Sequence, residues 1–281
     1  MKKYTLAKPN LSDESEYESD DGERYTPETV LGTGTHSVVR SLGSRSRRLK
    51  AVLQPRISKY DHSEIARKRA FFQGLYGETN VRFFDFKKKS TYRLIVPLLP
   101  GVPYSKLKLS SDPLEQINLM LRTVEAIEES HSKGIILVDF KENNILYHRE
   151  ENKSYLIDGG SAATIQNPFI DAFGYPADEI ESAKKMFSHL APECFYIKGN
   201  GPPIPIRAQP SMDVYSLGNT IVYLYKKYKL NPTILDLCAR CQHANPEERP
   251  TMAELKEALL QLEKSLKPST NDPETQQLRS P

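Results

Sequence analysis

The central part of the chain alternates short apolar runs with polar groups. The apolar runs occupy residues 135–138, 145–147 and 155–157, and polar residues or glycines follow each of them. Short apolar runs bounded by turn residues are typical of buried strands. We therefore predict a strand, a loop, a second strand, a turn and a third strand across residues 131–160, ending at a glycine corner.

Longer stretches repeat their apolar residues at helical spacing. They predict helices over residues 60–76, from Pro113 to about Lys133, and over residues 252–265. Asp112 and Thr251 stand directly before the second and third of these helices. Both residue types favour the N-cap, because their side-chain oxygens accept hydrogen bonds from the first unpaired backbone N–H groups.

The first part of the chain has the pattern of a sheet. Strand patterns occupy residues 28–39, 47–53, 81–86 and 92–99. The two prolines and the glycine in residues 97–101 suit a stiff connection to the rest of the chain. A strand-rich first part is therefore followed by a mainly helical second part.

Composition limits the class of protein. The chain has 281 residues, 38% of them apolar, which is enough for one large or two small domains. It has no run of 18 apolar residues, so we expect no transmembrane segment. Three cysteines give no disulfide framework and fit a reducing compartment. Cys238 and Cys241 have a metal-ligand spacing but no second pair, so we expect them on an apolar helix face.

Charge is unevenly distributed. Residues 45–93 hold fourteen Lys and Arg against four acidic residues, a net charge of +10, whereas the whole chain carries +3. Residues 1–24 are acidic and poor in apolar residues, so we predict an acidic disordered segment there. Residues 267–281 are also loop-like and are expected to form a disordered tail or a linker.

The basic segment Arg45–Lys89 has two interpretations. It is either a solvated surface or a site for a polyanionic activator, such as an inositol phosphate or a phosphoinositide. Few aromatic residues interleave with the basic ones, and no helix-turn-helix or RNA-binding signature is present. We therefore expect no nucleic-acid partner.

Four polar residues surround the predicted central loop and corner. Asp139, Lys141 and Asn144 form a D-x-K-x-x-N motif, and Asp158 follows the third strand. In phosphoryl transfer, one carboxylate can orient a hydroxyl and accept its proton, while an amide and a second carboxylate hold Mg²⁺ on the phosphates. Polar residues that only cap the turns of a buried hairpin would give the same short motif, so other parts of the chain must decide.

Further motifs lie in order on both sides of this stretch. They are Gly32-Thr-Gly34, Ala191-Pro192-Glu193, Asp213-x-x-Ser216-x-Gly218 and Pro246-x-x-Arg249-Pro250-Thr251. Over about residues 25–266 the chain resembles the eukaryotic-type protein kinase family. The resemblance implies an α+β, bilobal fold. Its N-lobe, residues 25–100, would be an antiparallel sheet plus one helix, and its C-lobe, residues 101–266, would be mainly helical.

The resemblance also implies a site for ATP and Mg²⁺. Asp139 would be the catalytic proton acceptor, and Lys141 would neutralise charge on the transferring phosphate. Asn144 and Asp158 would be the metal ligands. Gly32 and Gly34 would let backbone N–H groups approach the phosphates closely. Elsewhere in the C-lobe, Asp213 would tie down the catalytic loop and Arg249 would pair with Glu193.

The residues that position ATP depart from the family pattern. The family has a lysine on the strand at residues 47–53 and a glutamate on the following helix. We prefer Lys50 for the lysine, although an alternative alignment puts Leu53 at that position. On the helix, Lys68 stands where the glutamate is expected, and Glu64 lies one turn earlier. Either Glu64 contacts the lysine and its nucleotide after a shift of the helix, or the lysine is held in another way.

Two other motifs are altered. The family's H-R-D is Leu137-Val138-Asp139, which lacks the usual receptor for a phosphate on the activation segment, defined here as residues 158–193. Switching by phosphorylation of that segment is therefore not expected. The family's D-F-G is Asp158-Gly159-Gly160, which has no phenylalanine to move in and out. Neither change removes a group that touches phosphate or metal.

These observations predict a serine/threonine protein kinase that acts on protein substrates. A lysine at position 141 of the D-x-K-x-x-N motif resembles serine/threonine kinases more than tyrosine kinases. One alternative is a pseudokinase that binds nucleotide or partners without phosphotransfer. Another is a kinase-like enzyme with a non-protein acceptor, against which the motifs at Glu193 and Arg249 count. The departures and the basic N-lobe are similar to those of divergent effector kinases that intracellular bacteria deliver into host cells. We expect the protein to act in the cytoplasm, and this origin would place it in the cytosol of the host cell.

Overall fold

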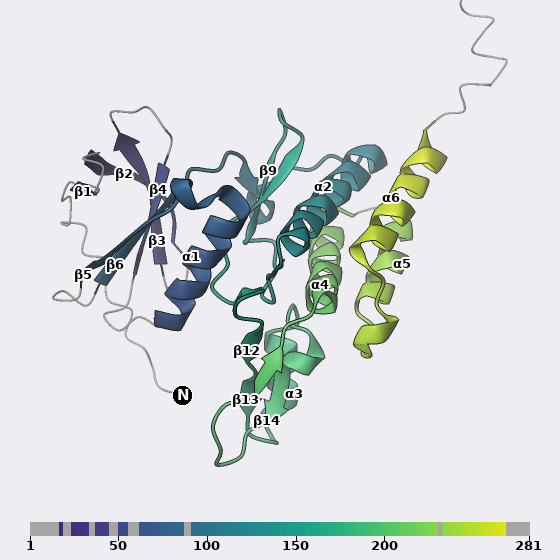
Figure 1. Cartoon of the computed structure of the whole chain (residues 1–281). Helices are drawn as coiled ribbons and strands as arrows, with labels where there is room; N and C mark the ends of the chain where they lie inside the picture. Colours follow the sequence, from purple (N-terminus) through teal and green to yellow (C-terminus); the bar gives the residue numbers. More distant parts are fainter. Residues whose placement is uncertain are drawn as a thin grey trace, which may run out of the picture.

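The computed structural model describes residues 17–18, 24–33, 37–44, 50–55, 62–86, 91–229 and 232–267. These residues form a sheet-based lobe and a helical lobe, which lie side by side in Figure 1. The α+β, bilobal architecture expected from the sequence is confirmed. One continuous apolar core runs from the sheet into the helical lobe, so the two lobes share buried surface.

The N-lobe is a six-stranded antiparallel sheet with the order β1-β2-β3-β4-β6-β5. Helix α1, His62–Tyr76, packs against it and buries Phe71 and Phe72. The strands are β1 Tyr17–Glu18, β2 Arg24–Thr33, β3 Ser37–Ser44, β4 Lys50–Pro55, β5 Arg82–Phe86 and β6 Thr91–Pro97.

The two ends of the chain are described only in part. Within the acidic segment 1–24, Tyr17–Glu18 pairs with the start of β2, a local departure from the disorder that we predict there. The rest of that segment before Arg24 lies outside the described residues, as does the tail beyond Lys267.

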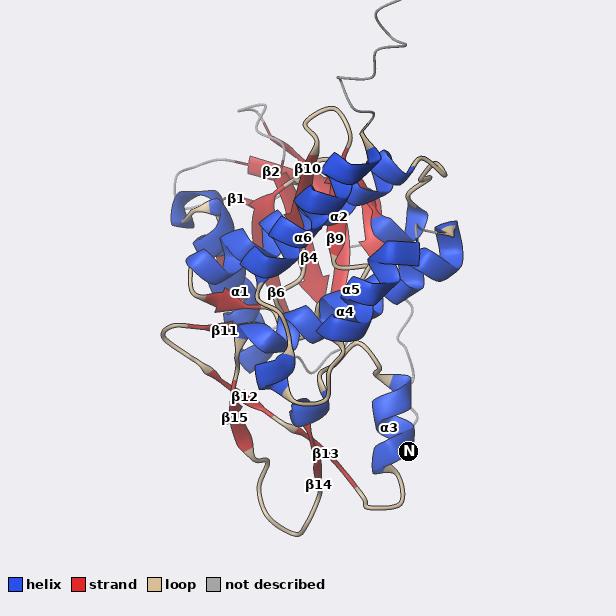
Figure 2. Cartoon of the chain, turned by 90° about the vertical axis from the view of Figure 1, so that its right-hand side faces the viewer, coloured by secondary structure: helices blue, strands red, loops and turns tan. Residues whose placement is uncertain are grey.

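Helices α2, α4, α5 and α6 are the main helices of the described C-lobe, and Figure 2 shows α6 lying across α2. The predicted caps are confirmed: Asp112 accepts a hydrogen bond from Leu114 N–H at 3.0 Å, and Thr251 forms a capping box with Glu254. The helices are α2 Pro113–Ser132, α4 Pro210–Tyr228, α5 Pro232–Cys241 and α6 Met252–Leu266. Single 3-10 turns are η1 Glu78–Asn80, η3 Tyr104–Lys106, η4 Pro192–Cys194 and η5 Pro246–Glu248.

Short strands connect the lobes and frame the polar residues. Strands β7 Val102–Pro103, β9 Ile145–His148 and β10 Lys153–Leu156 form a small sheet in the order β10-β9-β7. Strand β8, Ile135–Ile136, pairs with β11, Ala163–Thr164. The predicted D-x-K-x-x-N loop therefore lies between β8 and β9, and Asp158 lies just after β10.

The activation segment is folded against its own apolar cluster. Strand β12, Phe169–Asp171, pairs with β15, Pro205–Arg207, and β13, Phe173–Tyr175, runs parallel to β14, Phe195–Ile197. The short helix α3, Ile180–Met186, follows β13 and lies beside these strands in Figure 1. The cluster consists of Val138, Ala163, Ile170, Leu190, Ala191, Cys194, Ala208 and Met212.

Cys238 and Cys241 lie on the buried face of α5, within the main core. This confirms the expectation of an apolar helix face. Among the described residues, no helix has the length and apolar character to span a bilayer.

Candidate active site

Asp213, in the first turn of α4, holds the loop between β8 and β9. Its carboxylate accepts hydrogen bonds from the backbone N–H groups of Leu137, at 2.8 Å, and Val138, at 2.7 Å. The third partner is Nε2 of His131, at 2.8 Å. Asp213 is fully buried, and these partners offset the cost of burying its charge. They also hold Val138 at φ 66°, an unfavourable conformation for a β-branched residue, so Asp213 fixes the path of the chain into Asp139.

Two basic side chains hold the carboxylate of Asp139. Lys141 Nζ donates to Oδ2 at 2.8 Å and to Oδ1 at 3.0 Å, and His189 Nε2 lies 2.6 Å from Oδ1. Burial raises the pKa of Asp139, but the hydrogen bond from His189 and the charge of Lys141 outweigh it and keep that pKa below its ordinary value. The carboxylate is therefore ionised at neutral pH and can accept a hydrogen bond from a hydroxyl group.

The structure brings Asn144 and Asp158 to the same end of the β9–β10 hairpin. The backbone N–H of Ile157 donates to the backbone oxygen of Asn144 at 3.0 Å, one residue before Asp158. The Asn144 amide nitrogen donates to the backbone oxygen of Asp139 at 3.0 Å, which leaves the amide oxygen as an acceptor. The side chain of Asp158 is 43% exposed. An amide oxygen and an exposed carboxylate fit Mg²⁺, which typically binds one or two carboxylates together with water and phosphate oxygens.

Of the glycine-rich hairpin, the structure describes Gly32 and Ser37, and Ser37 reaches Lys68 of the candidate site. Gly32 pairs with Val39, and a Cβ there would meet no atom of the described residues within 4 Å. Ser37 stands in place of the family's third glycine, and its buried hydroxyl lies 3.4 Å from Lys68 Nζ. Gly34 lies outside the described residues.

The preference for Lys50 as the phosphate lysine needs correction. Lys50 begins β4, where it pairs with Pro97, and its Nζ donates to the backbone oxygen of Asn80 at 3.0 Å. Because side chains alternate along a strand, Lys50 points away from the face on which Ala51 and Leu53 join the core. This register supports the alternative alignment, in which Leu53 occupies the position of the family's lysine.

Lys68 of α1 faces Asp158. Its Nζ lies 2.8 Å from Glu64 Oε1 and 3.9 Å from Asp158 Oδ1, and its side chain is 6% exposed. Burial lowers the pKa of Lys68, but the charges of Asp158 and Glu64 outweigh it and raise that pKa above its ordinary value. The ammonium group is therefore charged, and Glu64 reaches the site as the partner of Lys68 one turn away on the same helix.

Two more contacts attach α1 to the corner at Gly159 and Gly160. Arg67 Nε donates to the backbone oxygen of Gly160 at 2.7 Å. A Cβ added to Gly159 would collide with the ring of Phe71, which is completely buried. Phe71 therefore fills the space beside the position that carries the phenylalanine of D-F-G in the family.

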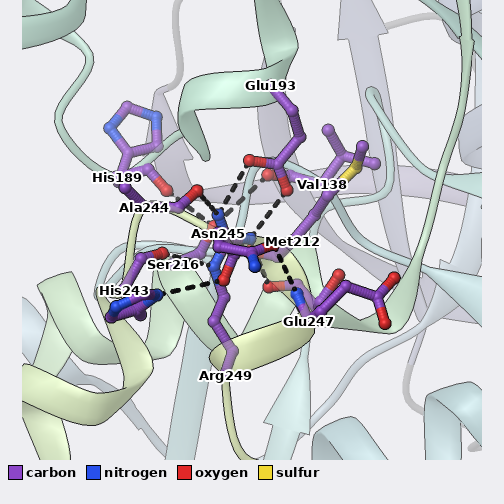
Figure 3. A network of polar contacts seen from close by, with 11 residues as sticks. Val138, His189, Glu193, Met212, Ser216, His243, Ala244, Asn245, Glu247 and Arg249 are labelled. Carbon is purple, nitrogen blue, oxygen red and sulfur yellow. Dashed lines mark hydrogen bonds and ion pairs between the residues drawn. The ribbon is translucent and has the colours of Figure 1, made fainter.

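Glu193 and Arg249 form the predicted ion pair at the end of the activation segment (Figure 3). The pair is bidentate, with Nη1–Oε1 at 2.6 Å and Nη2–Oε2 at 2.8 Å. The guanidinium group is fully buried and also donates to the backbone oxygens of Ser211, His243 and Ala244. A planar guanidinium suits this arrangement, because it offers five donors in a fixed fork.

Ser216 of α4 connects the activation segment to the catalytic loop (Figure 3). Its hydroxyl donates to the backbone oxygen of His189 at 2.6 Å and lies 3.4 Å from the backbone oxygen of Val138. The residue that contacts Asp139 from the activation segment is therefore tied to the same helix that holds the loop.

Compared with known protein families, residues 25–232 match the protein kinase domain. The chain belongs to the protein kinase family. It is 26% identical over 191 residues to "Probable cell division control protein 7 homolog 2" of Encephalitozoon cuniculi, an alignment that covers 64% of this chain and 53% of that protein. The chain thus spans about half the length of the first curated relatives that it matches.

Two further kinases are similar over shorter stretches. "Probable serine/threonine-protein kinase vps15" of Dictyostelium discoideum is 30% identical over 125 residues, which are 42% of this chain and 6% of that protein. "Serine/threonine-protein kinase PknA" of Nostoc sp. is 28% identical over 164 residues, which are 50% of this chain and 27% of that protein.

Two residues of this kinase's candidate site, Lys68 and His189, are not predicted from motifs. Lys68 is visible in the sequence as a departure from the family's helix glutamate, but the sequence does not show which way its side chain points. His189 lies two residues before Ala191, and no motif marks it. Its contact with Asp139 depends on how the activation segment folds around Val138.

Proposed function

We propose that this protein kinase transfers the γ-phosphoryl group of Mg-ATP to serine or threonine hydroxyls of protein substrates. Asp139 would accept the proton of the hydroxyl, and Lys141 would neutralise charge beside the transferring phosphate. Bound Mg²⁺ would supply charge neutralisation on the phosphates. Its ligands would be Asn144 and Asp158, and the glycine-rich hairpin at Gly32 and Gly34 would contribute backbone N–H groups.

The environment of Asp139 carries this proposal. Its carboxylate is ionised, contacts Lys141 and His189, and follows a loop segment that Asp213 fixes. In the transfer, the hydroxyl oxygen bonds to the γ-phosphorus, the bond from that phosphorus to the leaving ADP oxygen breaks, and the hydroxyl proton moves to Asp139. Because such a reaction gains most from positioning, a loop that Asp213 already holds before substrate arrives favours it.

The C-lobe supports a protein acceptor. The bidentate pair of Arg249 and Glu193 anchors the end of the activation segment, which forms the substrate platform in protein kinases. The choice of serine or threonine rests on Lys141 and on the names of two similar kinases. An enzyme that phosphorylates a small molecule would have no need for this anchored segment.

A pseudokinase is the second candidate, because Leu53 occupies the strand position of the phosphate lysine. Transfer of radiolabel from [γ-³²P]ATP, with Mg²⁺ and with or without a cell extract, separates the two. We expect labelled protein with the wild type and none with Asp139→Asn or Asp158→Asn. Asp236→Asn, on the exposed side of α5, serves as the control and should label like the wild type. ATP binding without any label in either condition would favour the pseudokinase.

We also propose a polyanionic activator for the basic segment Arg45–Lys89. Within it, Arg67 and Lys68 turn toward the Asp158 corner, and Arg69 lies over the ring of Phe83 at 5.8 Å. A surface site would therefore use the other basic residues, most of which lie outside the described residues. Titration with inositol hexakisphosphate should raise the melting temperature, and no change at low-millimolar concentration would exclude this activator.

We propose that the protein acts in the cytoplasm. If it is an effector delivered by an intracellular bacterium, it would act in the cytosol of the host cell. Support comes from the resemblance to divergent effector kinases. Fractionation of infected and uninfected cells with a tagged chain would test it, and recovery outside the cytosolic fraction would contradict it.

A further inference from the structure

Strand β4 brings no ammonium group to the Asp158 corner, which is formed by residues 158–160. Leu53 is 5% exposed and belongs to the same buried core as Ile65 and Phe72 of α1. The lysine of this strand, Lys50, donates instead to the backbone oxygen of Asn80. A nucleotide bound at Asp158 would therefore lack the strand lysine that holds its phosphates in the family.

Helix α1 brings an ammonium group to this corner from another element. Lys68 Nζ lies 3.9 Å from Asp158 Oδ1 and 3.4 Å from Ser37 Oγ. Asp158 is a candidate Mg²⁺ ligand, and Ser37 follows the glycine-rich turn. The ammonium group of Lys68 thus lies between the two structures that would face the phosphates of a bound nucleotide.

We propose that Lys68 is the lysine that binds the ATP phosphates in this kinase, and that Glu64 is its positioning residue. The inference rests on the proposed function, since it requires Mg-ATP at Asp158. Lys68 and Glu64 are four residues apart, so they lie on the same face of α1, and their 2.8 Å ion pair directs the ammonium group toward the corner.

Lys68 keeps donors for a phosphate oxygen. An ammonium group has three donors, and in Lys68 one of them is used at short distance, by Glu64. The separation of 3.9 Å from Asp158 exceeds a hydrogen bond, and the contact with Ser37 is long. Lys68 can therefore keep Glu64 and still donate to an anion at the corner.

The ion pair of Lys68 and Glu64 lies within one element of the N-lobe. In the family, the ion pair joins a strand lysine to a helix glutamate, so it reports whether the helix is in place. Here both partners belong to α1 and move with it as one unit. Phe71 against Gly159 and Arg67 on Gly160 then keep α1 at the corner without an ion pair from the strand.

Calorimetric titration of the full chain with Mg-ATP and with adenosine tests the assignment, since adenosine has no phosphates. Lys68→Met should raise the Kd of Mg-ATP about tenfold or more, the effect of losing a hydrogen bond to a charged group, and leave the Kd of adenosine unchanged. Lys50→Met, the matched control on β4, should change neither. Glu64→Gln should raise the Kd of Mg-ATP by a smaller factor, again without affecting adenosine.

Three outcomes decide against the assignment. Wild-type Kd values for Mg-ATP in Lys68→Met, with phosphoryl transfer intact in the wild type, would overturn the role of Lys68 and leave the proposed function standing. Equal weakening of ATP and adenosine would show a structural role for Lys68. Failure of the wild type to bind Mg-ATP would overturn the proposed function and this inference together. Should Lys68→Met not fold, Lys68→Gln keeps a polar group in the buried site for the same comparison.

A double variant that moves the lysine from α1 back to β4 tests whether Lys68 replaces the strand lysine of the family. Leu53→Lys with Lys68→Glu restores the family's arrangement of strand lysine and helix glutamate. We expect it to bind Mg-ATP more tightly than Lys68→Glu alone. A double variant that melts like the wild type but recovers no affinity would count against Lys68 as the substitute for a strand lysine.

Discussion

The ring of Phe71 fills the space that a side chain on Gly159 would need, so only one of the two positions can carry a large group. Phe71 is completely buried on α1, and Gly159 follows the candidate metal ligand Asp158. The aromatic group that the family attaches to the D-F-G corner is therefore supplied by the helix. Together with Lys68, it makes α1 the source of two side chains that other elements provide in the family.

Exchange of the two side chains should be partly tolerated. Phe71→Ala leaves a cavity and should lower the free energy of unfolding by about 3–5 kcal/mol. Gly159→Phe alone should also destabilise, because the new ring has no space. In the double variant Gly159→Phe/Phe71→Ala, the loss measured by urea unfolding should be smaller than the sum of the single losses. Phe169→Ala, at an exposed position, is the control. Additive losses would show that the two positions do not share one space.

The ion pair of Glu193 with the buried side chain of Arg249 should be far more sensitive to substitution than a surface pair. Arg249→Lys cannot reproduce the bidentate contact and leaves backbone oxygens without donors, so we expect a loss of about 2–4 kcal/mol in unfolding free energy. Lys256, which lies 3.1 Å from Glu128 on the surface, is the matched comparison. Lys256→Met should change the free energy by less than about 1 kcal/mol. Similar effects of both substitutions would contradict this account.

Asp213 should control the order of the catalytic loop. Asp213→Ala removes the acceptor of the Leu137 and Val138 N–H groups, and we expect a loss of about 2–4 kcal/mol in stability and a lower kcat. Hydrogen exchange of those two amides should become faster than that of the neighbouring β9 strand. Asp236→Ala, on an exposed helix face, should leave both measurements unchanged. Unaltered protection of the Leu137 and Val138 amides would contradict the role of Asp213 in holding this loop.

The cysteines should make stability fall in alkaline solution. Burial raises the pKa of Cys194 and Cys241 to about 12 and that of Cys238 to about 11, from an ordinary value of 9.0. Above pH 9.0 the unfolded thiols ionise while the native ones stay protonated, so the native chain binds more protons and its stability declines as pH rises through the folded pKa values. Urea unfolding below and above pH 9.0 measures this decline. Cys238→Ala/Cys241→Ala should show a smaller decline.

Thiol reactivity gives an independent check on the same burial. The native chain should react slowly with Ellman's reagent at neutral pH, and urea should release all three thiols. Rapid reaction of any of them in the native chain would show that the helix face of α5 or the cluster around Cys194 opens readily.

Local patterns predict much of this kinase. The helix caps at Asp112 and Thr251 follow from residue types at fixed positions, and the pairing of Arg249 with Glu193 follows from the family motifs. Strand register is different, because a shift of one residue moves every side chain to the other face of the sheet. That ambiguity separates Lys50 from Leu53, and the pairing of β4 with β6 favours Leu53 as the position of the family's lysine.

The contacts of Lys68 with Asp158 and of His189 with Asp139 require tertiary information. The helical pattern of α1 places Lys68 on the helix, but the shape of the Asp158 corner decides that its ammonium group turns inward. His189 reaches Asp139 because the activation segment packs on Val138 and because Ser216 holds the His189 carbonyl. None of these partners is near in sequence, so no local periodicity could indicate them.

The apolar environment of Val138 bears on how the activity of this kinase would be regulated. In this cluster, side chains such as Ile170 and Leu190 surround the position that usually carries a phosphate receptor. Because hydrophobic burial already orders this segment, we expect that it does not require phosphorylation by another enzyme. We expect phosphatase treatment to leave the initial rate unchanged, and a loss of rate would contradict this. Output would then depend on the amount of the kinase and on an activator such as the polyanion proposed above, rather than on an upstream kinase.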